Sequence, residues 1–429
     1  MKVSFYALGC KVNQYEIDCY AKIFSDSGWE IGNFSEKCDA YVINTCAITN
    51  IGERKSRQII RRAKKQNPDA VVAVTGCYAQ TKAEEVKNMS EADVVLGTAN
   101  RAHICRIVEA KIKGEDIDLL CDIMRERDYE ELECEGRCER TRAYIKIQDG
   151  CDNFCSYCIV PYARGPVRSR SLENIIPEAK RLAEAGFREI VLTGISVASY
   201  GKDLKDGNTL KNVIKEVCKV EGIERVRLSS ISPNIFNNEF IDFIANEKKM
   251  CRHFHISLQS GSTSVLKRMN RKYSAEEYLD TLERIRAAMP DCGITTDIIC
   301  GFPEESDEEF LETMEFVKKA HFLKVHVFPY SERSGTVAAR MEQIPHSIRE
   351  ERAAKLTTLT EEIAKEVEKS FIGQSLAVLF EQTEGEYIQG LAGNYLRIYA
   401  KGGEDLTGEI RSVKITEYKD GKIYGEIIK

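Results

Sequence analysis

The first part of the chain alternates short apolar runs with charged, amphipathic stretches. Apolar runs rich in Val and other β-forming residues are typical of strands, and here they are residues 2–9, 40–46, 70–77 and 92–98. Charged stretches with helical spacing, such as residues 50–70, separate the runs. This alternation predicts a parallel α/β sheet, whose functional end is the carboxyl edge of its strands.

The same alternation returns from about residue 143 to residue 340. Six strand candidates are residues 142–148, 189–195, 225–231, 253–260, 293–303 and 323–331. Helical stretches such as residues 173–186 and 274–289 lie between them. Six βα units predict a (β/α)6 partial barrel, with its active site at the C-terminal ends of the strands.

The C-terminal part has a different pattern. From residue 371 onwards apolar and polar positions alternate and glycines interrupt them, which predicts a small antiparallel β-barrel. One long charged helix is expected over residues 347–370, and the charge-dense residues 121–142 are interpreted as a connector that includes either a hairpin or no regular structure. The expected multidomain α/β division is an N-terminal α/β domain at 1–120, a linker at 121–142, a partial barrel at 143–367 and a terminal β-barrel at 368–429.

Composition narrows the class of protein. The 429 residues, 43% hydrophobic and 30% charged, suit a globular protein of two or three domains. No apolar run spans a membrane and no signal peptide is visible, so we expect a cytoplasmic protein without membrane contact. The net charge of −6 excludes a general basic coat but not a local basic face. Sixteen cysteines in such a chain indicate metal or redox chemistry rather than disulfides.

Three cysteines are close together after the first strand candidate of the barrel. The segment "GCDNFCSYCIVPYARG" (residues 150–165) places Cys151, Cys155 and Cys158 at a C-x3-C-x2-C spacing. Thiolates are the usual ligands of iron–sulfur clusters, whereas zinc prefers a closed four-ligand site. Three ligands would leave one iron of a [4Fe–4S] cluster open to a small chelating molecule. A structural zinc loop and incidental surface cysteines are the alternatives.

This spacing, with the aromatic Tyr157 before the last cysteine, resembles the radical S-adenosylmethionine (SAM) superfamily. The resemblance implies that SAM chelates the open iron, and that one electron from the cluster cleaves SAM to a 5′-deoxyadenosyl radical. The implied cofactor-binding residues are Tyr157, Thr193, Gly194, Ser229, Gln259 and Asp297. We interpret His253 and His255 as ordinary strand positions.

A second set of cysteines lies in the N-terminal domain. Cys10, Cys46 and Cys77 each end a predicted strand, and the carboxyl ends of parallel strands converge at one edge of a sheet. Three thiolates gathered there would make a second three-ligand site, whereas three buried strand-end cysteines are the simpler alternative. Spacing alone does not decide between them.

The combined motifs resemble the methylthiotransferases over essentially the whole chain. They are "GC-x-x-N" at residue 9, "NTCA" at residue 44, the second "GC" at residue 76, the C-x3-C-x2-C loop and the terminal β-barrel. The resemblance implies that the two sets of cysteines hold two [4Fe–4S] clusters and that all six cysteines serve catalysis. It also implies that the terminal barrel is a TRAM domain, which binds RNA.

The resemblance also implies the reaction. These enzymes attach a methylthio group to an unactivated carbon, with two SAM molecules per turnover, one methylating the sulfur and one supplying the radical. The segment "GCKVNQYE" (residues 9–16) is similar to the branch that acts on threonylcarbamoyladenosine-37 of tRNA. The other branches act on isopentenyladenosine-37 or on an aspartate of a ribosomal protein. The implied partners are a tRNA anticodon loop and an electron-donating reductase, flavodoxin or ferredoxin, and we expect a monomer.

Two surfaces are candidates for RNA contact. Residues 51–66 carry seven basic residues and one acidic residue, so this helix either tracks phosphates or is simply a solvated face. In the terminal domain, bases of a splayed loop would stack on aromatic residues beside basic ones. The residues of that expected face are Arg397, Arg411, Lys414, Tyr395 and Tyr399. The pair Cys134 and Cys138 has no assigned role.

Overall fold

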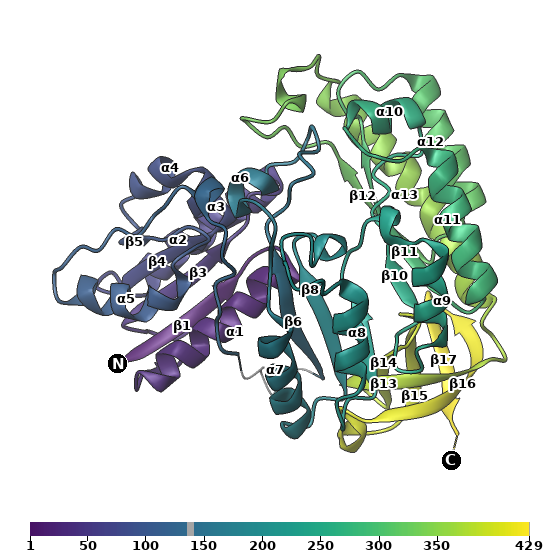
Figure 1. The fold of residues 1–429 in the computed structure, drawn as a ribbon, viewed down its shortest axis with the longest axis horizontal. Helices are drawn as coiled ribbons and strands as arrows, with labels where there is room; N and C mark the ends of the chain where they lie inside the picture. Colours follow the sequence, from purple (N-terminus) through teal and green to yellow (C-terminus); the bar gives the residue numbers. More distant parts are fainter. Residues whose placement is uncertain (135–140, 429) are drawn as a thin grey trace.

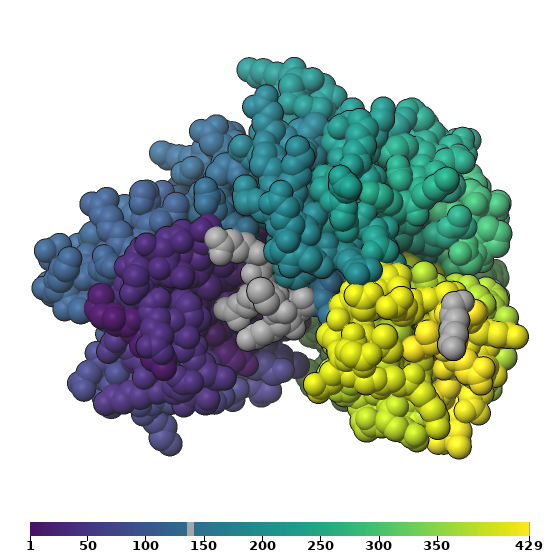
Figure 2. All heavy atoms as spheres, turned by 90° about the horizontal axis from the view of Figure 1, so that it is seen from below, coloured from purple at the N-terminus to yellow at the C-terminus, as the bar shows by residue number. Residues whose placement is uncertain are grey.

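The computed structural model describes residues 1–134 and 141–428. Figure 1 shows three parts that follow one another along the chain: an N-terminal α/β domain, a central partial barrel and a small C-terminal β-barrel. The N-terminal domain lies beside the central part, and the C-terminal barrel lies beneath it. In Figure 2, seen from below, the purple N-terminal domain and the yellow C-terminal barrel both adjoin the teal central part.

The N-terminal domain is built on a parallel five-stranded sheet, in the order β2-β1-β3-β4-β5. Its strands are β1 (Lys2–Ala7), β2 (Glu30–Ile31), β3 (Ala40–Thr45), β4 (Val71–Gly76) and β5 (Val94–Val95). Its helices are α1 (Lys11–Asp26), α2 (Asn50–Gln66), α3 (Cys77–Thr81), α4 (Ala83–Lys87), η1 (Arg101–His103) and α5 (Ile104–Ile112). The predicted parallel sheet is confirmed. The sequence pattern does not predict β2, because a two-residue exposed strand leaves no apolar run.

The two faces of this sheet are covered by different helices. Val42 packs into a core with α1 and α5, whereas its neighbour Ile43 packs into a core with α2, α3 and α4. Successive residues of a strand point to opposite faces, so both faces of β3 and β4 are buried. This burial explains the unbroken apolar runs in the sequence and leaves the carboxyl edge as the accessible side of the sheet.

The central part is a partial barrel made of two sheets, β7-β6-β8-β9 and β10-β11-β12. Isolated parallel bridges from Val226 to Met250 and from Ile231 to Ile256 connect the two sheets. The strands are β6 (Arg142–Asp149), β7 (Arg168–Ser169), β8 (Glu189–Gly194), β9 (Arg225–Leu228), β10 (His253–His255), β11 (Gly293–Cys300) and β12 (Lys324–Pro329). All six strands that the sequence predicts are present, as β6 and β8–β12, and β7 adds a short antiparallel edge.

Helices cover the outside of this barrel. They are α7 (Leu172–Glu184), η3 (Val197–Ser199), α8 (Leu210–Cys218), η4 (Pro233–Ile235), α9 (Asn238–Asn246), α10 (Thr263–Arg268), α11 (Ala275–Ala288), α12 (Asp307–Ala320) and α13 (His346–Lys369). The short helix α6 (Val160–Arg164) instead packs against the N-terminal domain, and η5 (Ala338–Arg340) belongs to a separate small core near Tyr157. Outward side chains such as Ile145, Leu192 and Phe254 form one hydrophobic core with these helices. The alternate positions face the barrel interior and are mostly polar, which makes the interior a place for polar chemistry.

The C-terminal part is a closed five-stranded barrel in the order β13-β14-β15-β17-β16. Its elements are β13 (Ser375–Glu384), β14 (Tyr387–Ala392), β15 (Arg397–Lys401), η6 (Glu404–Leu406), β16 (Ile410–Lys419) and β17 (Lys422–Ile427). All its strand pairs are antiparallel except β15 with β17, which is parallel. The architecture is consistent with a TRAM-like domain, as the sequence predicts.

This small barrel packs against the lower end of the central barrel. Arg225 donates to the carbonyl oxygen of Leu391, at 3.1 Å, and Arg227 donates to that of Ala392, at 3.3 Å. The ring of Tyr395 stacks on that of His253 with 4.1 Å between centroids. The prediction that Tyr395 belongs to an RNA-binding face is therefore wrong, since its ring serves the contact between domains. Tyr399 is also buried.

The connector contains one 3-10 helix, η2 (Ile123–Arg125), and none of its described residues from 121 to 134 forms a strand. Leu132 and Cys134 are buried in the N-terminal core, so this segment is packed rather than loose. Cys138 lies outside the described residues. No helix in the described part of the chain is long and apolar enough to cross a membrane.

Candidate active site

The N-terminal cysteines meet at the carboxyl edge of three neighbouring strands. Cys10 caps α1 after β1, Cys46 follows β3, and Cys77 is the first residue of α3 after β4. Gly9 has a φ of +94°, and a Cβ atom there would lie 2.9 Å from Cys46 Sγ. Only glycine allows this approach, because it alone adopts this backbone without strain and leaves room for the sulfur.

The electrostatics of this triad call for a cation. Burial, together with the charges of Cys77 and Cys10, raises the pKa of Cys46 to about 12. Burial also raises the pKa of Cys77, while the guanidinium of Arg164 lowers it. Three thiolates can share this edge only with a positive partner, and cluster iron provides one. The residues present therefore fit a cluster.

The second triad lies on the loop between β6 and α6. The backbone N–H of Cys158 donates to the carbonyl of Cys155, at 2.9 Å, and that of Cys151 donates to Gly165, at 3.0 Å. Burial and the charges of the other two cysteines raise the pKa of Cys158 to about 12. Arg271 donates to Cys155 Sγ at 3.4 Å, so one ligand already has a cationic neighbour. All three thiols are partly exposed and free, which suits a cluster that must reach a cofactor.

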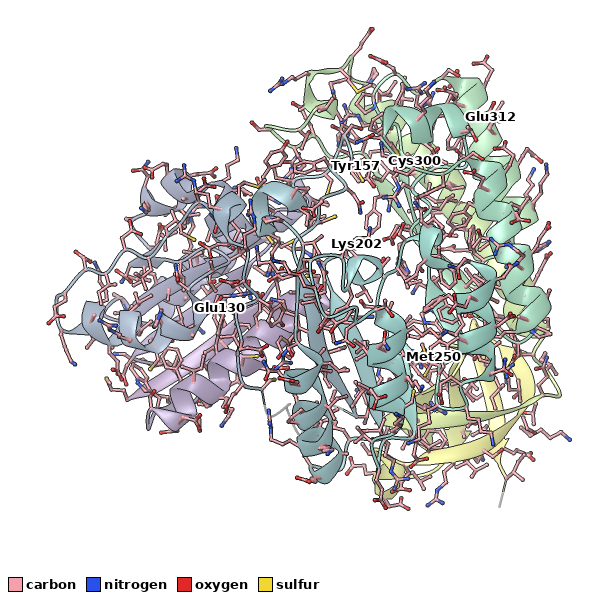
Figure 3. The ribbon with its side chains drawn as sticks, in the orientation of Figure 1. Glu130, Tyr157, Lys202, Met250, Cys300 and Glu312 are labelled. Carbon is pink, nitrogen blue, oxygen red and sulfur yellow. The ribbon has the colours of Figure 1, made fainter. Side chains whose placement is uncertain are left out.

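Three of the implied cofactor-binding residues line one pocket of about 210 Å³. Tyr157, Gln259 and Asp297 share it with Cys158, and Ile48 closes it from the loop after Cys46. Figure 3 shows Tyr157 at the upper end of the barrel, between the N-terminal domain and the strands β10–β12. The pocket thus lies between the two cysteine loops.

The other three implied residues lie on β8 and just after β9. Thr193 is buried, and a Cβ on Gly194 would lie 2.9 Å from the carbonyl oxygen of Gln148, so β6 and β8 approach closely there. Ser229 is buried, and its hydroxyl has no hydrogen-bond partner among the described residues. A buried hydroxyl without a partner is rare unless a ligand completes it, so this position fits a bound cofactor. None of these three residues lines the pocket of Tyr157.

Asp297 belongs to a polar group that sequence reasoning did not assemble. Its carboxylate lies 3.1 Å from Nε2 of His255, and Thr295 Oγ1 lies 3.0 Å from Nδ1 of the same ring. His326 on β12 completes a set of three potential ligand atoms within 4.8 Å of one another. The register of the three parallel strands places Asp297 beside His326. In the sequence, the polar residues of "HFH", "TTD" and "KVH" on three successive strand candidates could have indicated this group. His255 is therefore more than an ordinary strand position.

A buried charge network connects the two triads. Glu16 of α1 accepts from Arg101, Arg164 and Lys146, and Asp149 at the end of β6 accepts from Lys146 at 2.5 Å. Burial alone would raise the pKa of Glu16, but Arg164, Arg101 and Lys146 outweigh it and hold the pKa well below its usual range. Asp149 precedes the cysteine loop and Arg164 follows it, so the network fixes that loop against the N-terminal domain.

Comparisons with known protein families match both halves of this site. The radical SAM superfamily matches residues 145–317, and uncharacterized protein family UPF0004 matches residues 2–97. Among solved structures, the radical SAM methyltransferase TsrM from Kitasatospora setae has a TM-score of 0.56 at 16% identity, covering 79% of this chain and 77% of that one. The fold, the cysteine loop and the superfamily match define a radical SAM enzyme, with a [4Fe–4S] cluster and SAM as its cofactors.

Relatives of known name place the chain more narrowly. It is 44% identical to "Threonylcarbamoyladenosine tRNA methylthiotransferase MtaB" of Bacillus subtilis, covering 99% of this chain and 95% of that protein. The protein of the same name from Aquifex aeolicus is 38% identical, covering 96% and 99%. The "tRNA-2-methylthio-N(6)-dimethylallyladenosine synthase" of Thermotoga petrophila is 35% identical, covering 100% and 97%. The chain belongs to the methylthiotransferase family of radical SAM enzymes.

Proposed function

We propose that this enzyme converts N6-threonylcarbamoyladenosine at position 37 of tRNA to its 2-methylthio derivative. The observation that carries the proposal is the 44% identity, over 99% of the chain, to a relative named for this activity. The relative named for dimethylallyladenosine is less similar, at 35% identity. The net change replaces the C2–H bond of the base by a C2–S bond that carries a methyl group.

Each triad has its own role in this proposal. Cys151, Cys155 and Cys158 hold the cluster that binds SAM, and a second [4Fe–4S] cluster is held by Cys10, Cys46 and Cys77. When bound, the two clusters and two SAM molecules per turnover supply a 5′-deoxyadenosyl radical and a methylated sulfur. Residues that hold SAM are Tyr157, Thr193, Gly194, Ser229, Gln259 and Asp297. The shared pocket between the two cysteine loops supports this division, because chemistry at both sites must reach one base.

The chain's own side chains orient and protect these sites. Arg271 and Arg164 each donate to a cysteine sulfur, and both guanidinium groups stay charged at neutral pH. The C-terminal barrel packs against the lower end of the central barrel, whereas the pocket between the two cysteine loops lies at the other end, so the base enters from the end that bears these loops. The target base must leave its stack to reach that end.

The proposal extends to modules and partners. We assign residues 1–120 to the domain of the second cluster, 121–142 to a linker, 143–367 to the radical SAM barrel and 368–429 to a TRAM domain. Separate hydrophobic cores support this division. The anticodon loop of tRNA is the substrate surface, a reductase, flavodoxin or ferredoxin supplies electrons, and the enzyme acts in the cytoplasm as a monomer.

Nucleoside mass spectrometry of total tRNA tests the proposal. Cells that lack the protein should lose 2-methylthio-threonylcarbamoyladenosine, and a plasmid copy should restore it. Restoration of a methylthio group on isopentenyladenosine instead would assign the enzyme to the other tRNA branch. Unchanged tRNA with loss of a methylthio-aspartate from a ribosomal protein would assign it to the third branch.

A further inference from the structure

Helix α2 carries seven basic residues in a chain whose net charge is −6. Its inner face is formed by Ser56, Ile60 and Ala63, which are buried, and Ile60 and Ala63 belong to the hydrophobic core on one face of the N-terminal sheet. The charged side chains therefore lie on the sides and the back of the helix. Their effect on the surroundings depends on which of them have an acidic partner.

Three of the seven cations pair with acidic residues of neighbouring segments. These pairs are Arg57–Glu85 at 3.2 Å, Arg61–Glu91 at 3.7 Å and Lys64–Asp93 at 2.8 Å. The three cations are spaced at i, i+4 and i+7, so they form one stripe along the helix. Glu53 is the one acidic residue of α2, and it accepts a hydrogen bond from Arg333 at 2.7 Å. It therefore does not neutralise the remaining cations.

Among the described residues, the other four cations of α2 form no ion pair. They are Arg54, Lys55, Arg62 and Lys65, and all four are exposed. The guanidinium of Arg62 lies over the ring of Phe34, at 5.5 Å from its centroid, a contact that leaves the positive charge in place. Exposed positive charges without partners create a potential that attracts anions. In an acidic chain, this surface is a local exception.

The helix begins at the edge of the pocket between the two cysteine loops. Thr49 lines this pocket and caps α2 by accepting from the backbone N–H of Gly52 at 3.0 Å. The backbone N–H of Asn50 donates to Oγ of Ser331, on the loop after β12, at 3.1 Å. The first turn of α2 is therefore fixed to the central barrel, and the helix leads away from the pocket.

The four unpaired cations are spread along the helix. Arg54 and Lys65 are eleven residues apart, which corresponds to a rise of about 16 Å. A polynucleotide backbone fits this arrangement, because its charges also repeat along a line. An acidic protein surface is the alternative anion. An electron donor of that kind has to approach a cluster, whereas these charges lead away from the cysteine loops.

We propose that Arg54, Lys55, Arg62 and Lys65 bind the phosphates of the tRNA strand next to the modified base. This inference rests on the proposed function, because it takes the target base to lie in the pocket at the start of α2. The unstacked base enters the pocket, and the backbone on one side of the base follows the helix. Such contacts fix the position of the RNA but do not read its sequence.

Salt-dependent binding of an anticodon stem-loop to the anaerobic, cluster-loaded enzyme tests the inference. Each phosphate contact contributes about 0.7 to the slope of log affinity against log salt, which is about 5-fold in affinity at about 0.1 M salt. A variant with Gln at all four positions should lower this slope by roughly 1.5–3 and weaken binding at that salt by roughly 30- to 1000-fold. Exchanging Arg for Lys and Lys for Arg at the same positions should preserve both values.

Four cations on other helices provide the matched control. They are exposed, form no ion pair among the described residues, and lie on α5, α7, α8 and α12: Arg106, Lys180, Lys215 and Lys319. Replacing these four by Gln makes the same change of net charge and should leave slope and affinity at the wild-type values. Wild-type iron content in both fourfold variants is the check that their clusters are loaded.

The outcomes separate this inference from the proposed function. If the α2 variant keeps the wild-type slope and affinity, or the control variant loses as much, the inference is overturned while the proposed function stands. Slower reduction of the clusters by an acidic electron donor, with unchanged RNA binding, would also overturn it and assign the helix to that donor. If the wild-type enzyme binds the stem-loop but forms no 2-methylthio-threonylcarbamoyladenosine, the proposed function fails, and a reduced slope in the α2 variant still supports the phosphate contacts.

Discussion

Arg164 donates a hydrogen bond from its Nε atom to the Sγ atom of Cys77, at 3.3 Å. Its guanidinium is fully buried and also donates to Asn13 Oδ1 at 2.6 Å and to Glu16. Arg164 lies at the end of the helix that follows one cysteine loop, whereas Cys77 belongs to the other triad. One side chain therefore joins the two sites and places a permanent positive charge on a cluster ligand.

Replacing Arg164 by Lys should weaken the second cluster and spare the first. Lysine keeps the charge that Glu16 needs but loses the bond to sulfur, a contribution of about 1.5–3 kcal/mol for a charged group. Loss of a donor to sulfur disfavours the more negative, reduced cluster, so its reduction potential should fall. Redox titration followed by electron paramagnetic resonance measures this, with Arg181→Lys on α7 as the control. An unchanged potential would remove Arg164 from the cluster's environment.

Replacing Glu16 by Gln should destabilise the fold by about 3–5 kcal/mol, because it leaves three buried cations short of a partner. The pKa of Glu16 is depressed in the folded state, so its contribution is full above the ordinary carboxyl pKa of about 4.3. The contribution is lost as the pH falls from there towards the lower folded value. Thermal unfolding at pH 7 and at pH 3.5 should show a smaller difference from wild type at the lower pH. Glu84→Gln, on the surface, is the control.

Variants of the two cysteine triads should differ in whether they still cleave SAM. Replacing Cys10, Cys46 and Cys77 together by Ala should lower the iron content from about eight to about four per chain, and leave SAM cleavage intact. Replacing Cys151, Cys155 and Cys158 should also leave about four irons but abolish 5′-deoxyadenosine. Anaerobic iron analysis and chromatography of the SAM products measure both. Equal loss of SAM cleavage in the two variants would contradict separate roles.

Replacing Asp297 by Asn should weaken SAM binding. The carboxylate lines the pocket next to Cys158 and pairs with His255, so the amide loses both the charge and the orientation of that ring. A loss of about 10-fold in SAM affinity is expected, the effect of one hydrogen bond at a polar site. Equilibrium binding of SAM to the loaded enzyme measures it, and the exposed Asp206→Asn should bind as the wild type does. Wild-type affinity in Asp297→Asn would place SAM elsewhere.

The sequence by itself determined what depends on neighbours along the chain. The apolar runs predict the strands of the N-terminal sheet and of the central partial barrel, because strands that are buried on their faces need apolar side chains. The spacing of Cys151, Cys155 and Cys158 predicts one cluster site, since its ligands lie on a single loop. The N-terminal triad is harder to predict, because Cys10, Cys46 and Cys77 are distant in sequence. The family resemblance is the only feature of the sequence that connects them, and the order of the strands in the sheet then explains why they meet.

Only the tertiary structure decided what depends on contacts between domains. Arg164 meets Cys77, and Lys146 of β6 meets Glu16 of α1, because the N-terminal domain packs against the central part. Tyr395 looks like a surface aromatic in the sequence, yet it stacks on His253 where the C-terminal barrel meets the central part. Side-chain direction across an interface follows from the packing of whole domains, and no local pattern of residues encodes it.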